Sequence, residues 1–248
     1  MVTRQTTSGT AGPRSERAPN LAPPEGEHRG VLWWRLDPSW SALSSAPVGG
    51  GWNHAQWLVN VGVPLDYART DLVEHAGEIV RGLGLLDGGV GRGAGGQSRS
   101  GPGAGGQIRT CQGIALFTAA DVSQVQHVER DGVAVSATVG VTKPTWAADA
   151  SGGWSPWTPG TINLVVQLPV ALHPGAMVNA VMTATEAKAQ ALLEAGVPGT
   201  GTASDAVVVL CPGRGDLEPF AGPRSPWGSR LALGVHDAVR AGLAVGSC

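Results

Sequence analysis

The second half of the chain alternates between apolar strand-like runs and helical segments, and this alternation constrains the fold more than any other feature. Residues 161–168 and 205–210 are dense in Val, Ile and Leu, as expected of buried strands. Between them, a helix over residues 174–195 begins with proline and ends before glycine, and Ser229 is placed to cap a final helix. The pattern predicts a layered α/β fold with a mixed sheet flanked by helices, and a layered α+β arrangement is also compatible with it.

The chain before residue 142 contains further elements of the same kind. Behind Asp71, apolar residues recur at helical spacing and predict a helix over residues 72–80. Strands are expected at residues 31–36, 114–118 and 133–141. We therefore expect one main domain over residues 30–248.

Two segments lack the apolar periodicity of folded structure. Residues 1–29 are rich in Thr, Ser, Pro, Gly and charge, which predicts a disordered N-terminal tail. Residues 87–107 are dominated by glycine and predict a flexible insertion. The insertion contains G-x-G-x-x-G matches, but no strand precedes them and no helix follows, so we do not expect a dinucleotide site.

Composition excludes several classes of protein. A formal charge of −2 does not favour nucleic acid, and no apolar run approaches the ~20 residues that span a bilayer. The first residues lack the apolar core of a signal peptide, and the three cysteines have no paired spacing. These observations predict a cytoplasmic protein with reduced thiols, no membrane partner and no histidine-rich metal site. A homo-oligomer is compatible with the sequence.

A glycine loop is the first local feature that could take part in binding or catalysis. Such a loop can place backbone N–H groups against a phosphate or an oxyanion, or it can simply form a wide turn. The loop and the serine pair before it comprise Ser44, Ser45, Gly49, Gly50 and Gly51.

A second feature is the pair Thr161 and Asn163 at the start of an apolar strand. The period of two places both polar side chains on one face, where they form either a structural hydrogen-bond node or the edge of an active site. Asp121 follows another strand and suits either a general base or a helix cap.

The long predicted helix carries a polar stripe, and a small-residue loop leads to Asp205 at the head of the next strand. The stripe is compatible with a substrate-facing surface and equally with a solvated outer face. Its members are Asn179, Thr183, Glu186 and Gln190.

Taken together, these segments resemble the adenosylcobinamide amidohydrolase (CbiZ) family over roughly residues 31–245. The glycine insertion lies outside the pattern. The segments that carry the resemblance, in this order, are residues 44–51, 117–122, 138–142, 160–166, 178–188, 199–209 and 221–228.

The resemblance implies an enzyme that hydrolyses the amide bond joining aminopropanol to the corrin ring of adenosylcobinamide, giving adenosylcobyric acid for cobalamin salvage. The corrinoid is then the substrate and no cofactor is expected, while the need for a metal is left open. Two alternatives remain: a non-catalytic corrinoid-binding module, or an amidohydrolase for another amide.

The resemblance supplies no mechanism residue by residue, so the roles are hypotheses from chemistry. Thr161, Asn163, Glu186 and Asp121 are the candidate catalytic residues, with either carboxylate supplying acid–base chemistry. Attack by the Thr161 hydroxyl and attack by an activated water are both compatible with this set. The candidate substrate-binding residues are Ser44, Ser45, Gly49, Gly50, Gly51, Asn179, Thr183 and Asp205.

Overall fold

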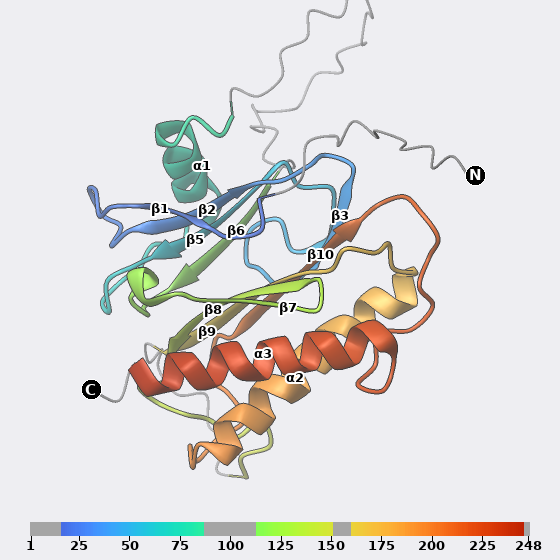
Figure 1. Cartoon of the computed structure of the whole chain (residues 1–248). Helices are drawn as coiled ribbons and strands as arrows, with labels where there is room; N and C mark the ends of the chain where they lie inside the picture. Colours follow the sequence, from blue (N-terminus) through green and yellow to red (C-terminus); the bar gives the residue numbers. More distant parts are fainter. Residues whose placement is uncertain (1–15, 87–112, 151–159, 246–248) are drawn as a thin grey trace, which may run out of the picture.

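The protein is organised in four layers. The computed structural model describes residues 16–86, 113–150 and 160–245. Within these residues, α1 covers a four-stranded sheet, which packs on a six-stranded sheet covered by α2 and α3 (Figure 1). The α/β class expected from the sequence is confirmed. The strands form two mixed sheets, however, where we expected one.

The four-stranded sheet has the order β1-β2-β5-β6, in which β5 and β6 are parallel and the other neighbours are antiparallel. Its strands are β1 (Asn20–Ala22), β2 (Val31–Arg35), β5 (Trp57–Gly62) and β6 (Gly113–Thr118).

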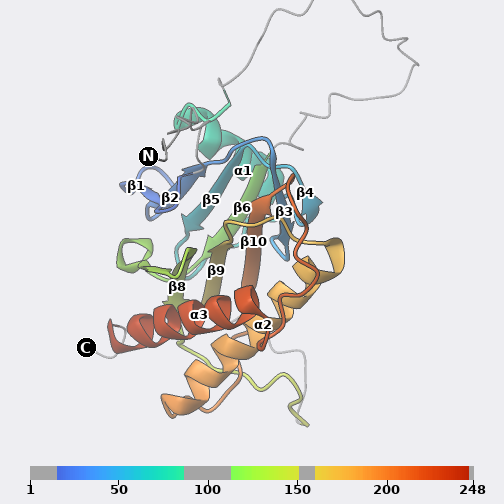
Figure 2. The ribbon, with the colours of Figure 1, turned by 45° about the vertical axis from the view of Figure 1, so that its right-hand side comes forward.

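The six-stranded sheet has the order β4-β3-β10-β9-β8-β7, in which only β9 and β10 are parallel neighbours (Figure 2). Its strands are β3 (Trp40–Ser44), β4 (Gly51–Asn53), β7 (Gln126–Arg130), β8 (Val133–Gly140), β9 (Thr161–Gln167) and β10 (Ala206–Pro212).

Strand β9 shows how two sheets arise from a pattern that is compatible with one. Every residue of β9 is buried, because Ile162, Leu164 and Val166 pack toward α2 and α3 while Val165 packs between the sheets. A strand that is buried on both faces has the same apolar sequence pattern whether its second face packs on a layer of helices or on another sheet. The number of sheets was therefore decided by contacts between distant segments.

The helices lie close to the expected positions. Helix α1 spans Leu72–Gly82, and α2 spans Pro174–Glu194 with Gly196 beyond it in a left-handed conformation. Helix α3 spans Pro226–Val245 and begins three residues before Ser229, the cap that we predicted. The reason is that Ser225 accepts a hydrogen bond from the Gly228 backbone N–H, so the cap lies further upstream.

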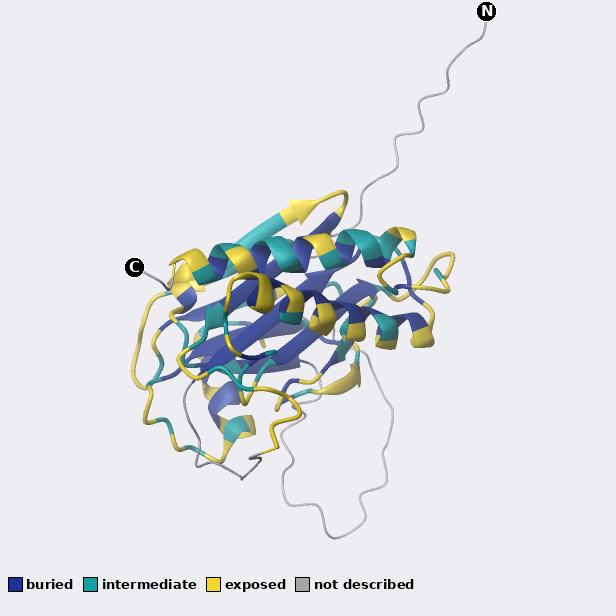
Figure 3. Ribbon diagram, turned by 90° about the horizontal axis from the view of Figure 1, so that it is seen from below, coloured by how far each residue is buried: buried dark blue, intermediate teal, exposed yellow. Residues whose placement is uncertain are grey.

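The outer helices bury one side against the sheet and expose the other, which carries both polar and apolar residues. Seen from their own side, α2 and α3 expose their outward residues and cover buried strands (Figure 3). Alanines recur on the buried side of α2, which lets the helix approach the sheet closely. These alanines are Ala176, Ala180, Ala184, Ala187 and Ala191.

The predicted N-terminal tail differs from the structure at its end. Residues 16–29 are described and contain β1, which pairs with β2, so regular structure begins before residue 30. Residues 1–15 and the predicted glycine insertion at residues 87–107 lie outside the described residues.

Candidate functional site

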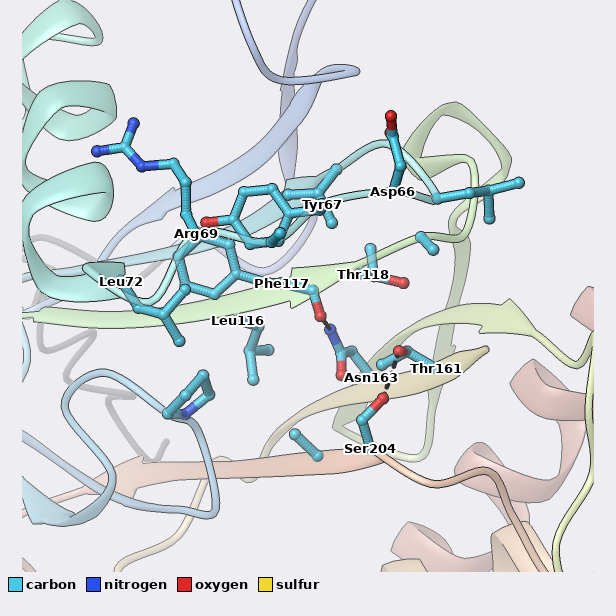
Figure 4. A pocket seen from close by; sticks show the side chains of 16 residues that line it. Asp66, Tyr67, Arg69, Leu72, Leu116, Phe117, Thr118, Thr161, Asn163 and Ser204 are labelled. Atoms are coloured by element: carbon cyan, nitrogen blue, oxygen red, sulfur yellow. Dashed lines mark hydrogen bonds between the residues drawn. The ribbon is translucent and has the colours of Figure 1, made fainter. Parts of the chain in front are cut away.

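A cavity of about 630 Å³ opens at one end of the two packed sheets. It lies where β6 ends and where β9 and β10 begin, and the segment between β5 and α1 forms its rim (Figure 4). The volume falls within the range of small-molecule sites. We call it the Thr161 pocket, and its polar lining side chains are Asp66, Tyr67, Arg69, Thr118, Thr161, Asn163 and Ser204.

Two hydroxyl groups meet in this pocket. Thr161 is buried at the first position of β9, and its Oγ1 lies 2.8 Å from Oγ of Ser204, in the loop before β10 (Figure 4). Because β9 and β10 are parallel neighbours, their starts lie at the same edge of the sheet. The structure thus places Thr161 among the residues that line the pocket.

Asn163 lies two residues further along the same face of β9 and is fully buried. Its Nδ2 donates to Oδ1 of Asn60 at 2.9 Å and to the Phe117 carbonyl at 3.1 Å. Asn60 comes from β5 and also donates to the Thr138 hydroxyl at 3.0 Å, so the network joins the two sheets. Among the described residues the Oδ1 of Asn163 has no partner, although an unpaired buried acceptor costs about 1–3 kcal/mol. Asn163 is among the residues that line the Thr161 pocket.

Asp205 lies behind this edge in a buried ion pair. Its carboxylate pairs with Lys188 of α2, and the two side chains are 12% and 8% exposed. It also accepts hydrogen bonds from the Ile162 N–H at 2.9 Å, the Thr202 N–H at 3.1 Å and the Thr202 hydroxyl at 2.5 Å. Asp205 therefore holds together the loop before β10 and the start of β9, and it is not among the lining residues of the pocket.

Aromatic rings form one wall of the pocket. Tyr67 and Phe117 stack with a centroid separation of 6.0 Å, and His75 of α1 stacks on both rings. The Tyr67 hydroxyl lies 2.7 Å from Nδ1 of His75. Burial lowers the pKa of His75 and raises the pKa of Tyr67, so both side chains are neutral at pH 7.

Arg69 stands at the rim beside these rings. It makes ion pairs with Glu27, Asp71 and Glu78, which raise the pKa of its guanidinium. In turn, the hydrogen bond from Arg69 lowers the pKa of Asp71 to about 2. The Asp71 side chain caps no backbone N–H of α1, because its carboxylate binds Arg69 instead.

The glycine loop has a structural role in the described geometry. A Cβ on Gly49 would collide with the Gly113 carbonyl, and a Cβ on Gly50 would collide with the Ala46 carbonyl. The hydroxyls of Ser44 and Ser45 accept hydrogen bonds from backbone N–H groups of Ala46 and Val207, respectively. Gly51 has a positive φ and belongs to β4, and Pro47 is the residue of this loop that lines the pocket.

The structure does not bring the two candidate acid–base residues to Thr161. Asp121 is exposed and caps the short 3₁₀ helix η1 (Val122–Gln124) through the Ser123 N–H, which is the alternative that the sequence left open. Glu186 is exposed on the outer side of α2, in a separate groove between α2 and α3.

The other members of the polar stripe also lie away from the Thr161 pocket. Thr183 is buried and donates to the Ala221 carbonyl at 2.9 Å, which ties α2 to the segment before α3. Gln190 is exposed beside Glu194, and Asn179 is half-buried on α2. None of these residues is among the lining residues of the Thr161 pocket.

Sequence reasoning did not single out Ser204, Asn60, Thr138 or Lys188. A polar residue in the middle of an apolar strand was the available signal for Asn60, which lies inside the run Leu58-Val59-Asn60-Val61. For Lys188, the signal was a charge among the alanines on one side of a helix.

Within the described ranges, no three or more His, Cys, Asp or Glu side chains gather in a way that could hold a metal ion. No helix of the described residues is long and apolar enough to cross a membrane.

The layers and the pocket define a layered α/β protein with a hydroxyl pair and an unpaired buried amide oxygen at one end of its two sheets. The model of one family, described as adenosylcobinamide amidohydrolase (CbiZ), matches residues 21–91 and 105–246. This chain belongs to the adenosylcobinamide amidohydrolase family.

Two curated proteins with the name adenosylcobinamide amidohydrolase are similar to the chain. The one from Halobacterium salinarum is 44% identical over 117 residues, which cover 45% of this chain and 50% of that protein. The one from Methanosarcina mazei is 32% identical over 140 residues, which cover 52% of this chain and 66% of that protein. The chain thus spans between half and two thirds of the length of these relatives.

Among solved structures, a Pyrococcus horikoshii OT3 protein aligns with a TM-score of 0.48 and 12% identity, covering 93% of this chain and 84% of its own. A Burkholderia sp. beta-aminopeptidase aligns with a TM-score of 0.42 and 12% identity, covering 93% of this chain and 83% of its own.

Proposed function

We propose that this chain hydrolyses the amide bond between aminopropanol and the corrin ring of adenosylcobinamide, and that the reaction takes place in the Thr161 pocket. Membership of the family supports the reaction. The names of both relatives support the same substrate. A cytoplasmic location belongs to the proposal as well, because Cys211 is a free thiol and unpaired cysteines are typical of reducing compartments.

One observation carries the location of the site: Asn163 and Thr161 line the same pocket, and the buried Oδ1 of Asn163 has no partner among the described residues. A secondary amide offers an N–H donor next to an electrophilic carbonyl carbon. The N–H satisfies the Asn163 acceptor while the carbonyl carbon faces Thr161, so a single group uses both features.

The size of the pocket determines which part of the substrate enters it. A corrin ring with its upper ligand is larger than a cavity of about 630 Å³. We therefore place the aminopropanol arm inside the pocket and the edge of the ring at its mouth. Tyr67 and Phe117 then offer flat apolar surface to the macrocycle.

Thr161 is the nucleophile in this proposal. Its Oγ1 attacks the amide carbon, an ester to Thr161 forms as the aminopropanol nitrogen leaves with a proton, and water then releases the corrinoid acid. No role is assigned to Asp121 or Glu186. Asp66 is exposed at the rim, and its carboxylate points away from Thr161 (Figure 4).

The test is incubation of the purified chain with adenosylcobinamide and analysis of the mixture by mass spectrometry. Adenosylcobyric acid together with free aminopropanol is the expected result. Bound but unchanged cobinamide would favour a corrinoid-binding module, and faster turnover of an unrelated amide would favour another amidohydrolase.

A pair of variants tests the role of Thr161. Thr161→Ala should lower the rate at least about 10⁴-fold, as loss of a nucleophile does. Thr185→Ala is the matched control, because that threonine is exposed on α2 and its hydroxyl donates to the Val181 carbonyl of the same helix. Near-normal turnover by Thr161→Ala would refute the assignment.

A further inference from the structure

A threonine nucleophile needs a general base, and the surroundings of Thr161 contain none among the described residues. The hydroxyl of Thr161 forms a hydrogen bond with the Ser204 hydroxyl, which is not a base at neutral pH. The nearest carboxylate in the network, that of Asp205, is occupied by Lys188, by the Ile162 N–H and by Thr202. Thr161 is therefore positioned without the group that would activate it.

The carbonyl oxygen of the preceding residue, Gly160, has unusual partners. The Ser204 hydroxyl lies 3.2 Å from this oxygen, and the Thr202 hydroxyl lies 2.7 Å from it and 2.5 Å from the Asp205 carboxylate, so the one proton of Thr202 is shared between these two acceptors. Two hydroxyl groups within hydrogen-bond distance of one carbonyl oxygen can both turn their protons to it as negative charge develops there, which is how an oxyanion is stabilised in acyl transfer.

The directions of these hydrogen bonds depend on the number of protons. Ser204 has one hydroxyl proton, which it can donate to the Gly160 carbonyl. Either hydroxyl can donate in the contact between Ser204 and Thr161, and when Ser204 donates to Gly160 it accepts the Thr161 proton. A proton path then runs from the attacking hydroxyl through Ser204 to the carbonyl that would be attacked.

We propose that the chain cleaves its own Gly160–Thr161 peptide bond and that the α-amine released on Thr161 becomes the general base of the site. In the first step, Thr161 Oγ1 bonds to the Gly160 carbonyl carbon, the C–N bond breaks, and the nitrogen takes up the proton of the hydroxyl. In the second step, water hydrolyses the resulting ester, leaving a carboxylate on Gly160 and a free hydroxyl and amine on Thr161.

The products fit the remaining chemistry of the pocket. An α-amine has an ordinary pKa of about 7.7–8.0, which suits a base near neutral pH. Release of the Gly160 carbonyl also frees the Thr202 and Ser204 hydroxyls to stabilise the oxyanion of a substrate amide. The same two donors thus serve both reactions, and this use of the amine rests on the proposed function.

The fold tolerates a cut at this position. Strand β9 begins at Thr161, so the break falls before its first residue. Pairing with β8 on one side and β10 on the other holds the new end in the sheet. The hydrogen bond between the Ile162 N–H and Asp205 fixes the next residue as well.

The experiment is to synthesise the full chain by cell-free translation and to follow it by denaturing electrophoresis and intact mass. We expect two fragments that remain associated under native conditions, one ending at Gly160 and the other beginning with Thr161. The rate should not change with protein concentration, because the reaction is intramolecular. An intact chain, or fragments that begin at another residue, would overturn the proposal.

Variants separate self-cleavage from the action of a contaminating protease. Thr161→Ala should give no fragments, whereas Thr161→Ser should still cleave. Ser204→Ala should slow cleavage on the order of 100-fold, as loss of one oxyanion donor does. Ser229→Ala is the matched control, because the hydroxyl of this half-buried serine donates to the Pro226 carbonyl of its own helix. Equal cleavage in Thr161→Ala and the wild type would refute the mechanism.

Activity measurements distinguish failure of this inference from failure of the proposed function. An intact chain that hydrolyses adenosylcobinamide would refute self-cleavage and leave the function standing. A cleaved chain without hydrolysis would leave self-cleavage standing and refute the substrate. Where both occur, the rate should fall as the pH drops below the pKa of the Thr161 amine, and an unchanged rate there would refute the role of the amine.

Discussion

Removing either partner of the ion pair between Lys188 and Asp205 should destabilise the fold strongly, and the two substitutions should differ in how much stability they cost. Loss of one partner of a buried pair costs about 3–5 kcal/mol, because the other charge is left in a medium that solvates it poorly. Lys188→Met leaves Asp205 with three hydrogen-bond donors, from Ile162 and Thr202. We therefore expect a loss near the lower limit, about 3 kcal/mol.

Asp205→Asn should cost more. The Lys188 ammonium donates a hydrogen bond to the Asp205 carboxylate, and the Lys188 side chain is only 8% exposed. The ammonium is then left without a counter-charge, and we expect a loss of about 4–5 kcal/mol. The double variant removes both charges, so its cost should fall below the sum of the single losses by about 1–3 kcal/mol.

Urea unfolding of the four proteins at neutral pH, followed by circular dichroism, measures these values. The control is Arg130→Met, which breaks the exposed pair between Arg130 and Asp237 and should cost less than about 1 kcal/mol. If Lys188→Met costs no more than Arg130→Met, or if Asp205→Asn is the milder variant, the argument from burial is refuted.

Two further predictions concern other parts of the fold. Burial and the charge of Arg69 lower the pKa of His75 in the folded protein. The contribution of neutral His75 to stability is therefore complete above its ordinary pKa of 6.5, and it is lost as the pH falls from 6.5 through the lowered pKa of the folded state. Between about pH 7.5 and about pH 5.5, His75→Gln should therefore lose less in Tm than the wild type, and an equal loss would contradict the reasoning. A Cβ on Gly242 of α3 would lie 2.6 Å from Cγ2 of Val139, so Gly242→Ala should cost about 1–3 kcal/mol in urea unfolding. Gly82→Ala, where the new Cβ meets nothing within 4 Å, is the control, and equal stability of the two variants would refute the packing argument.

Local sequence signals predicted most of the regular elements. The helix over Pro174–Glu194 follows from a proline at its start and a glycine beyond its end, and both devices depend only on neighbouring residues. The start of α3 was misplaced because Ser229 and Ser225 both suit a cap, and only the hydrogen bond to Gly228 distinguishes them. Strand β5 was missed, since its apolar run leads into a segment whose end is helical.

The candidate site was predicted in part for the same reason. Thr161 and Asn163 share a face of one strand, which is a local property, and they line the same pocket. Ser204 reaches Thr161 from a loop 43 residues away, and Asn60 reaches Asn163 from the other sheet. No pattern within a single segment could identify these two partners.

The sequence by itself determined the α/β class, the outer helices and the polar face of β9, because periodicity and capping act between near neighbours along the chain. Tertiary structure alone decided that the strands form two sheets, that Asp205 pairs with Lys188, and that Asp121 and Glu186 lie away from Thr161. Those outcomes depend on which buried surfaces pack together, and the polar groups that become buried with them must find partners across that packing.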